Sequence, residues 1–180
     1  DFPEGLYRRE VAAFELSETL GWRLVPGTVE REDAPLGVGS LQRFVEADFS
    51  RHYFALRDDG DHDDQLVRMA VFDIVANNTD RKAGHVLVDD DEHVWGIDNG
   101  LCFSTEARLR TVIWDFAGWP VPADLRDALA DLVRGGLPNR VTEHLLDDEI
   151  ELTIRRARAL VARGTLPHDP TGRAIPWPLL

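Results

Sequence analysis

An apolar helix followed by a very polar loop constrains the fold of this chain more than any other feature. Residues 65–76 (QLVRMAVFDIVA) are apolar over most of a helical surface and predict a helix that is largely buried. The next residues, 77–84 (NNTDRKAG), form a polar loop. Two short apolar runs, 85–88 and 93–97, flank the acidic turn DDDE and predict a β-hairpin. The chain therefore places a polar loop between two elements of its core.

The rest of the chain predicts helices and a few short strands. Apolar residues on one helical face predict a helix from Arg8 to Leu20, which Gly21 ends. We further expect an apolar segment at 22–29 that Pro26 interrupts, a short strand at 41–46, a solvated loop at 47–64, helices at about 123–134 and 142–163, and an extended tail at 164–180. Strands cluster before residue 100 and helices after it, so the predicted fold class is α+β.

Length and charge exclude several kinds of protein. With 180 residues, the chain is long enough for one domain with a substantial core. Its net charge of −13 argues against a nucleic-acid binder and against unaided adhesion to an anionic membrane. The single cysteine, Cys102, excludes an internal disulfide framework and fits a reducing compartment. Because we find neither a signal peptide nor a run long enough to span a bilayer, we expect a cytoplasmic protein without stable membrane insertion.

Two aspartates lie where phosphoryl transfer would need them. Asp80 lies in the polar loop, and Asp98 opens the sequence Asp-Asn-Gly directly after the hairpin. In protein kinases, an Asp on a loop orients the acceptor hydroxyl, a group five residues later helps to hold a metal, and an Asp-x-Gly after a hairpin binds Mg²⁺. His85 stands five residues after Asp80, and Gly100 completes the Asp-x-Gly. The residues alone leave a second interpretation open, in which these are ordinary turn residues around a hairpin.

The chain resembles the phosphatidylinositol 3-/4-kinase superfamily, above all the type II phosphatidylinositol 4-kinases and their small actinobacterial relatives of unknown substrate. The matching segments are NNTDRKAGHVLV for the catalytic loop, GIDNGLCF for the metal-binding segment, GSLQRFVEAD for a strand and hinge, REVAAFELSETLGWRLVPGTV for a helix and the strand after it, and IWDFAGWPVPADLRDAL for the segment that follows the metal-binding Asp. The resemblance implies a protein-kinase-like fold, with residues 1–46 as a remnant of the N-terminal lobe and 47–180 as the C-terminal lobe.

The resemblance also implies an active site. It makes Asp80 the catalytic carboxylate, Arg81 its loop partner and Asp98 a ligand of Mg²⁺ or Mn²⁺. Lys82, the only lysine of the chain, lies two residues from Asp80. It could reach a phosphate of ATP there, or it could be a solvated loop cation.

Further residues would bind the nucleotide. Glu10 would be the helix carboxylate that pairs with the family's phosphate-anchoring lysine. The hinge that faces adenine would consist of Phe44, Val45 and Glu46. The anchoring lysine should precede Glu10, yet only nine residues do so, and none of them is Lys. Since the chain begins with Asp1, we expect the lysine strand and the phosphate-covering loop in an N-terminal segment that this chain lacks.

His85 departs from the family, which usually has Asn at this position. Mg²⁺ prefers oxygen ligands, whereas an imidazole suits a softer ion such as Mn²⁺. His85 could therefore bind a metal, contact phosphate or simply hold the loop.

Other residues have simpler interpretations. Asn77 and Asn78 are better explained as caps of the preceding helix than as ligand contacts. Cys102 is better explained as a small buried filler than as a nucleophile. Trp114 and Trp119 could pack in the core or line an acceptor pocket.

These expectations lead to two hypotheses for function. The first is an ATP-dependent phosphotransferase, a kinase that uses Mg²⁺ or Mn²⁺ and whose acceptor is a lipid, a small molecule or a protein hydroxyl. The second is a nucleotide-binding pseudokinase or scaffold without turnover, which the missing lysine and the histidine at position 85 suggest.

Overall fold

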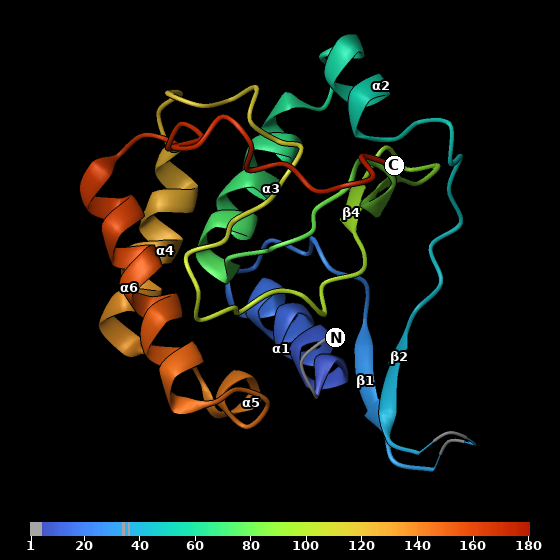
Figure 1. The fold of residues 1–180 in the computed structure, drawn as a ribbon, viewed down its shortest axis with the longest axis vertical. Helices are drawn as coiled ribbons and strands as arrows, with labels where there is room; N and C mark the ends of the chain where they lie inside the picture. The colour runs from blue at the N-terminus through green and yellow to red at the C-terminus, as the bar shows by residue number, and fades with distance from the viewer. Residues whose placement is uncertain (1–4, 34, 36) are drawn as a thin grey trace.

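A computed structural model describes residues 5–33, 35 and 37–180 as a mixed arrangement of helices and short strands (Figure 1). The elements are, in chain order, α1 (Leu6–Thr19), β1 (Thr28–Arg31), β2 (Gly39–Gln42), α2 (Tyr53–Asp59), α3 (Asp63–Ala76), the 3₁₀ turn η1 (Ala83–His85), β3 (Val86–Val88), β4 (Val94–Gly96), α4 (Ala123–Gly135), α5 (Asn139–Thr142) and α6 (Asp147–Arg163). No helix in this described part combines the length and apolar character needed to cross a bilayer.

Two antiparallel hairpins make up the regular β-structure of the described residues. Strands β3 and β4 pair in the register that sets Leu87 opposite Trp95, which confirms the predicted hairpin. Strands β1 and β2 pair with Val29 opposite Leu41. The strand predicted at 41–46 was misplaced, because β2 ends at Gln42 and the following residues leave β1.

The apolar segment at 22–29 is mostly irregular, and only its end is a strand. Leu24 and Val25 are nevertheless buried, at 1% and 2% exposure. The hydroxyl of Ser17 on α1 accepts hydrogen bonds from both of their N–H groups, at 2.8 and 3.3 Å. In addition, Gly96 of β4 donates its N–H to the Leu24 carbonyl at 2.7 Å. This segment therefore joins α1 to the β3–β4 hairpin.

The prediction of a solvated loop at 47–64 was wrong, because this stretch contains α2 and the start of α3. Polar residues dominate the stretch, but Tyr53 and Leu56 lie three positions apart on one helical face and are fully buried. Gly60 ends α2 in the left-handed conformation, with φ at 75°. His62, within the acidic run, is also buried.

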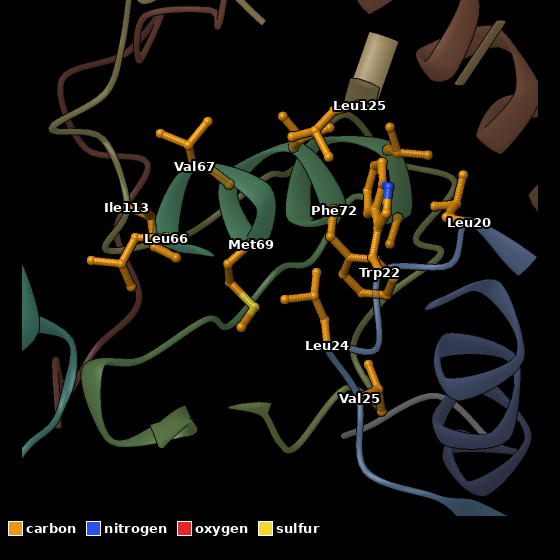
Figure 2. Close-up of a cluster of buried hydrophobic side chains, with 14 of the residues drawn as sticks. Leu20, Trp22, Leu24, Val25, Leu66, Val67, Met69, Phe72, Ile113 and Leu125 are labelled. Carbon is orange, nitrogen blue, oxygen red and sulfur yellow. The ribbon is translucent and has the colours of Figure 1, made fainter. Parts of the chain in front are cut away.

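Helix α3 is the centre of the hydrophobic core. It buries Leu66, Met69, Phe72 and Val75, and it confirms the helix predicted at 65–76. Figure 2 shows Trp22 and Leu24 packed against the side of α3 that bears Phe72 and Met69. The C-terminal end of α3, where the polar loop begins, is thus fixed by the core.

Of the helices after residue 120, α6 packs on α3, and α5 packs on α1. Helix α4 confirms the prediction at 123–134, and α6 packs against both α4 and α3. The helix predicted at 142–163 is divided, because Leu146 is extended and its N–H is capped by the Glu149 carboxylate at 2.9 Å. A short α5 therefore precedes α6.

We predict that Phe72→Ala lowers the free energy of unfolding by about 3–5 kcal/mol, because it leaves a cavity under α3. Phe49→Ala is the matched control, since the Phe49 side chain is 64% exposed. Its effect should stay within about 0.5 kcal/mol. Denaturant unfolding followed by circular dichroism measures both, and equal losses would contradict this assignment of the core.

Candidate active site

The Asp80 loop, residues 77–85, starts where α3 ends. Asn77 ends the helix in the left-handed conformation and donates from its amide to the carbonyls of Ser104 and Glu106, both at 2.7 Å. This confirms the predicted capping role of Asn77. The next residue, Asn78, is buried, and its side-chain oxygen accepts the Asp80 N–H at 2.9 Å. The loop therefore presents Asp80 from a turn that the helix end holds.

The Asp98 turn, residues 98–100, follows β4. Asp98 has a φ of 56°, a left-handed conformation that Asp tolerates better than most residues. Its side chain is 61% exposed, whereas Asn99 and Gly100 are buried. The Asn99 amide donates to the Gly96 carbonyl at 3.0 Å and closes the turn. As a result, Asp98 projects outward from a fixed backbone.

Arg81 joins the loop to the turn from inside the protein. Its side chain has no exposed surface and forms an ion pair with Asp73 of α3 at 3.0 Å. The same guanidinium donates to the Asn99 side-chain oxygen at 2.7 Å and to the Ile97 carbonyl at 2.8 Å. Burial alone would lower the pKa of Arg81, but the Asp73 carboxylate reverses this effect and raises it. We call Asp73, Arg81 and Asn99 the buried polar cluster.

Asp73 is the residue at the site that sequence reasoning missed. Besides Arg81, its carboxylate accepts hydrogen bonds from the Asn78 amide and the Thr111 hydroxyl, both at 3.2 Å. One buried carboxylate thus holds α3, the Asp80 loop and the segment around Thr111 together. The sequence feature that could have identified Asp73 is its place inside the apolar run VFDIVA, because a charge buried there needs a partner.

Two pairs of polar side chains lie in or next to the Asp80 loop. The Lys82 ammonium lies 3.3 Å from the Asp80 carboxylate, and both side chains are only partly exposed. Nε2 of His85 lies 3.3 Å from the carboxylate of Asp98. Burial and then the charge of Arg81 lower the pKa of His85, against the opposing effect of Asp98 and Asp80. His85 therefore lies within electrostatic reach of both carboxylates.

Glu10 reaches the Asp98 turn from α1. Its carboxylate accepts the Gly100 N–H at 2.7 Å. Burial raises the pKa of Glu10, although the N–H groups of Asn99 and Gly100 oppose this shift. Within the described residues, the partner of Glu10 is therefore the backbone of the turn, and the only lysine, Lys82, pairs with Asp80 instead.

The predicted hinge lies against the β3–β4 hairpin. Val45 is 7% exposed and packs with Leu87 and Trp95 in a small cluster of its own. Phe44 is 78% exposed, and Glu46 is also exposed. Among the residues that the structure describes, none hydrogen-bonds to the backbone of residues 44–47.

The donor atoms at this site fit a cation held mainly by phosphates. The described chain has no group of three or more His, Cys, Asp or Glu side chains that could hold a metal alone. Mg²⁺ characteristically takes one or two carboxylates and completes its shell with phosphate oxygens and water. The exposed Asp98 carboxylate meets that requirement. Nδ1 of His85 has no partner in the described chain, whereas Nε2 lies beside the Asp98 carboxylate, an acceptor that favours a proton on Nε2.

Two other predicted features lie in packing positions. Cys102 is fully buried, and burial raises the pKa of its thiol, as expected for a filler. The Trp114 indole donates to the Ala174 carbonyl at 2.9 Å. Trp119 is 46% exposed and packs edge-to-face on Phe116, with ring centroids 5.1 Å apart.

Comparison with known proteins shows the family to which the chain belongs. A sequence model of the family described as phosphatidylinositol 3- and 4-kinase matches residues 13–158. The chain belongs to this family. It is also similar to Protein Rv2133c of Mycobacterium tuberculosis, with 36% identity over 215 aligned positions that cover 99% of this chain and 77% of the relative. The matched region of this phosphatidylinositol 3- and 4-kinase family member includes the Asp80 loop and the Asp98 turn. Glu10 lies just before that region.

We predict that Asp73→Ala lowers the free energy of unfolding of this family member by about 3–5 kcal/mol, because it leaves Arg81 buried without a counter-charge. Asp131→Ala is the control, since Asp131 pairs with Arg134 on an exposed face of α4. That change should cost less than about 1 kcal/mol. Urea unfolding distinguishes the two, and a small effect at Asp73 would show that the ion pair does not hold the site together.

Proposed function

We propose that the chain transfers a phosphoryl group from ATP to a hydroxyl acceptor. The observation on which the proposal rests is the arrangement of the Asp80 loop and the Asp98 turn, which one buried polar cluster fixes to each other. Family membership supports a kinase-superfamily function. The use of ATP, the type of reaction and the role of each residue are what we propose in addition. Residues 1–46 would then belong to an N-terminal kinase lobe and residues 47–180 to a C-terminal lobe.

Asp98 and His85 would hold Mg²⁺ or Mn²⁺ against the phosphates of ATP. When bound, the cation would neutralise negative charge on the phosphates. Asp98 faces outward from a backbone that Glu10 and Arg81 hold. Binding of the cation therefore requires little rearrangement of the turn.

Asp80 would orient the acceptor hydroxyl and accept its proton, which is the role of the loop aspartate in kinases. Lys82 lies beside it and supplies a positive charge toward the transferred phosphoryl group. Arg81 has no exposed surface, so we assign it a positioning role and not a contact with substrate. The hinge, residues 44–46, would bind adenine through its backbone groups.

The acceptor could be a lipid, a small molecule or a protein hydroxyl. The net charge of −13 opposes unaided binding to an anionic membrane, so we do not favour a lipid acceptor. Nucleotide binding without turnover is the competing function. It would be supported if the chain bound ATP with a metal but neither hydrolysed nor transferred phosphate.

Mutation of the two aspartates separates their roles. We predict that Asp98→Asn weakens Mg²⁺-dependent ATP binding at least about tenfold, because it removes the charged oxygen ligand. Asp80→Asn should leave the Kd for Mg²⁺–ATP within about twofold and lower kcat by about 10²–10⁴, the usual range for loss of a general base. Titration calorimetry gives the first quantity and an ATP-turnover assay gives the second.

Asp131→Asn is the control for both measurements, since Asp131 lies on the exposed face of α4. Equal loss of ATP binding in the Asp80 and Asp98 variants would contradict the division of roles.

His85→Asn provides a separate test of the metal site. If Nε2 binds the cation, the oxygen of Asn should keep ATP binding and shift the preference from Mn²⁺ toward Mg²⁺ at least about threefold. The measurement is the ratio of the Kd values for Mn²⁺–ATP and Mg²⁺–ATP. An unchanged ratio would show that His85 only holds the Asp98 carboxylate.

A further inference from the structure

The last residues of the chain lie on the Asp80 loop. We call residues 174–180 the C-terminal strap. The Ala174 carbonyl accepts the Thr111 N–H at 3.1 Å and the Trp114 indole N–H at 2.9 Å. The Leu179 carbonyl accepts the Ala83 N–H at 2.8 Å. Figure 1 shows the C-terminal end beside the β3–β4 hairpin, next to the region where the loop passes into β3.

The strap continues a ladder of backbone hydrogen bonds that starts in the Asp80 loop. Arg81 donates its N–H to the Arg110 carbonyl at 3.0 Å and accepts the Val112 N–H at 3.1 Å. Thr111, which lies between Arg110 and Val112 in the chain, donates its N–H to the Ala174 carbonyl of the strap. Three segments that are distant in sequence therefore lie side by side, in the order loop, residues 110–112 and strap.

Leu179 is the apolar anchor of the strap. Its side chain packs against the main hydrophobic core. By contrast, Trp177 is 86% exposed and Leu180 is 65% exposed, so these side chains contribute little to docking. Ala83, the residue that the strap contacts, is fully buried, and a buried N–H group needs a partner. The Leu179 carbonyl supplies that partner.

The contact falls at a sensitive position of the proposed site. Ala83 begins η1, the turn that connects Lys82 to His85. Lys82 pairs with Asp80, and His85 contacts Asp98. A loose η1 would therefore let both contacts separate.

We propose that the C-terminal strap is a positioning element of the Asp80 loop. It holds η1 through the Leu179 carbonyl and thereby keeps Lys82 and His85 at the spacing that the two aspartates need. None of its side chains contacts substrate in this role. The effect on turnover rests on the proposed phosphotransferase function, but the effect on the loop itself does not.

Hydrogen exchange of the whole chain tests the proposal without any ligand. In Leu179→Asp, a charge at this partly buried position releases the strap from the core, and amide exchange in the peptide that contains Ala83 should become at least about tenfold faster. Trp177→Asp is the matched control, because it adds the same charge two residues away at an exposed position. Its exchange should equal that of the wild type.

Leu179→Ala is a second, milder variant in case Leu179→Asp does not fold, and it should also speed exchange at Ala83, by at least about threefold. Suppose that a Leu179 variant folds and that its strap peptide has lost its protection from exchange. If Ala83 then still exchanges as slowly as in the wild type, the proposal is overturned. Equal acceleration in Trp177→Asp would overturn it as well.

Turnover is the second measurement. In Leu179→Ala, kcat should fall at least about fivefold and the Kd for Mn²⁺–ATP should rise at least about twofold, because Lys82 and His85 are both displaced. If the wild type fails to bind Mn²⁺–ATP, the proposed function is overturned, and the exchange experiment still decides the role of the strap. If binding and kcat are both unchanged while the loop exchanges faster, the positioning role is overturned and the proposed function stands.

Discussion

The buried ion pair between Arg81 and Asp73 is the constraint on which the candidate site depends. Charges buried without partners are strongly unfavourable, so a guanidinium with no exposed surface must have its hydrogen bonds satisfied within the protein. The partners come from α3, from the end of β4 and from the Asp98 turn. Because Arg81 follows Asp80 directly, satisfying the guanidinium also fixes the position of Asp80 relative to Asp98.

This arrangement separates the rigid part of the site from its chemically exposed part. Arg81, Asp73 and Asn99 are buried and fully engaged, while Asp98 is 61% exposed and faces outward. Glu10 adds support from α1, at a distance of 90 residues along the chain. A site of this kind can bind a charged ligand with little movement, since the backbone that presents its carboxylates is already held.

Sequence alone predicted the elements that depend on local pattern. The helix before the loop, the hairpin after it and the helix cap at Asn77 all follow from neighbouring residues, as does the placement of Asp80 and Asp98 on either side of the hairpin. The helix α2 was missed because two buried residues, Tyr53 and Leu56, lie in a polar stretch. Asp73 and the strap contact at Ala83 were missed because they depend on partners 8 to 96 residues away, which no local pattern specifies.

A crystal structure with Mn²⁺ and a non-hydrolysable ATP analogue would test the central claim most directly. We predict an anomalous Mn²⁺ peak beside the Asp98 carboxylate and the phosphates, with Asp80 and Lys82 on the same side. Arg81 should keep its contacts with Asp73 and Asn99 in the complex. A peak away from Asp98, or an Arg81 released from Asp73 to contact phosphate, would contradict these roles of Asp98 and Arg81.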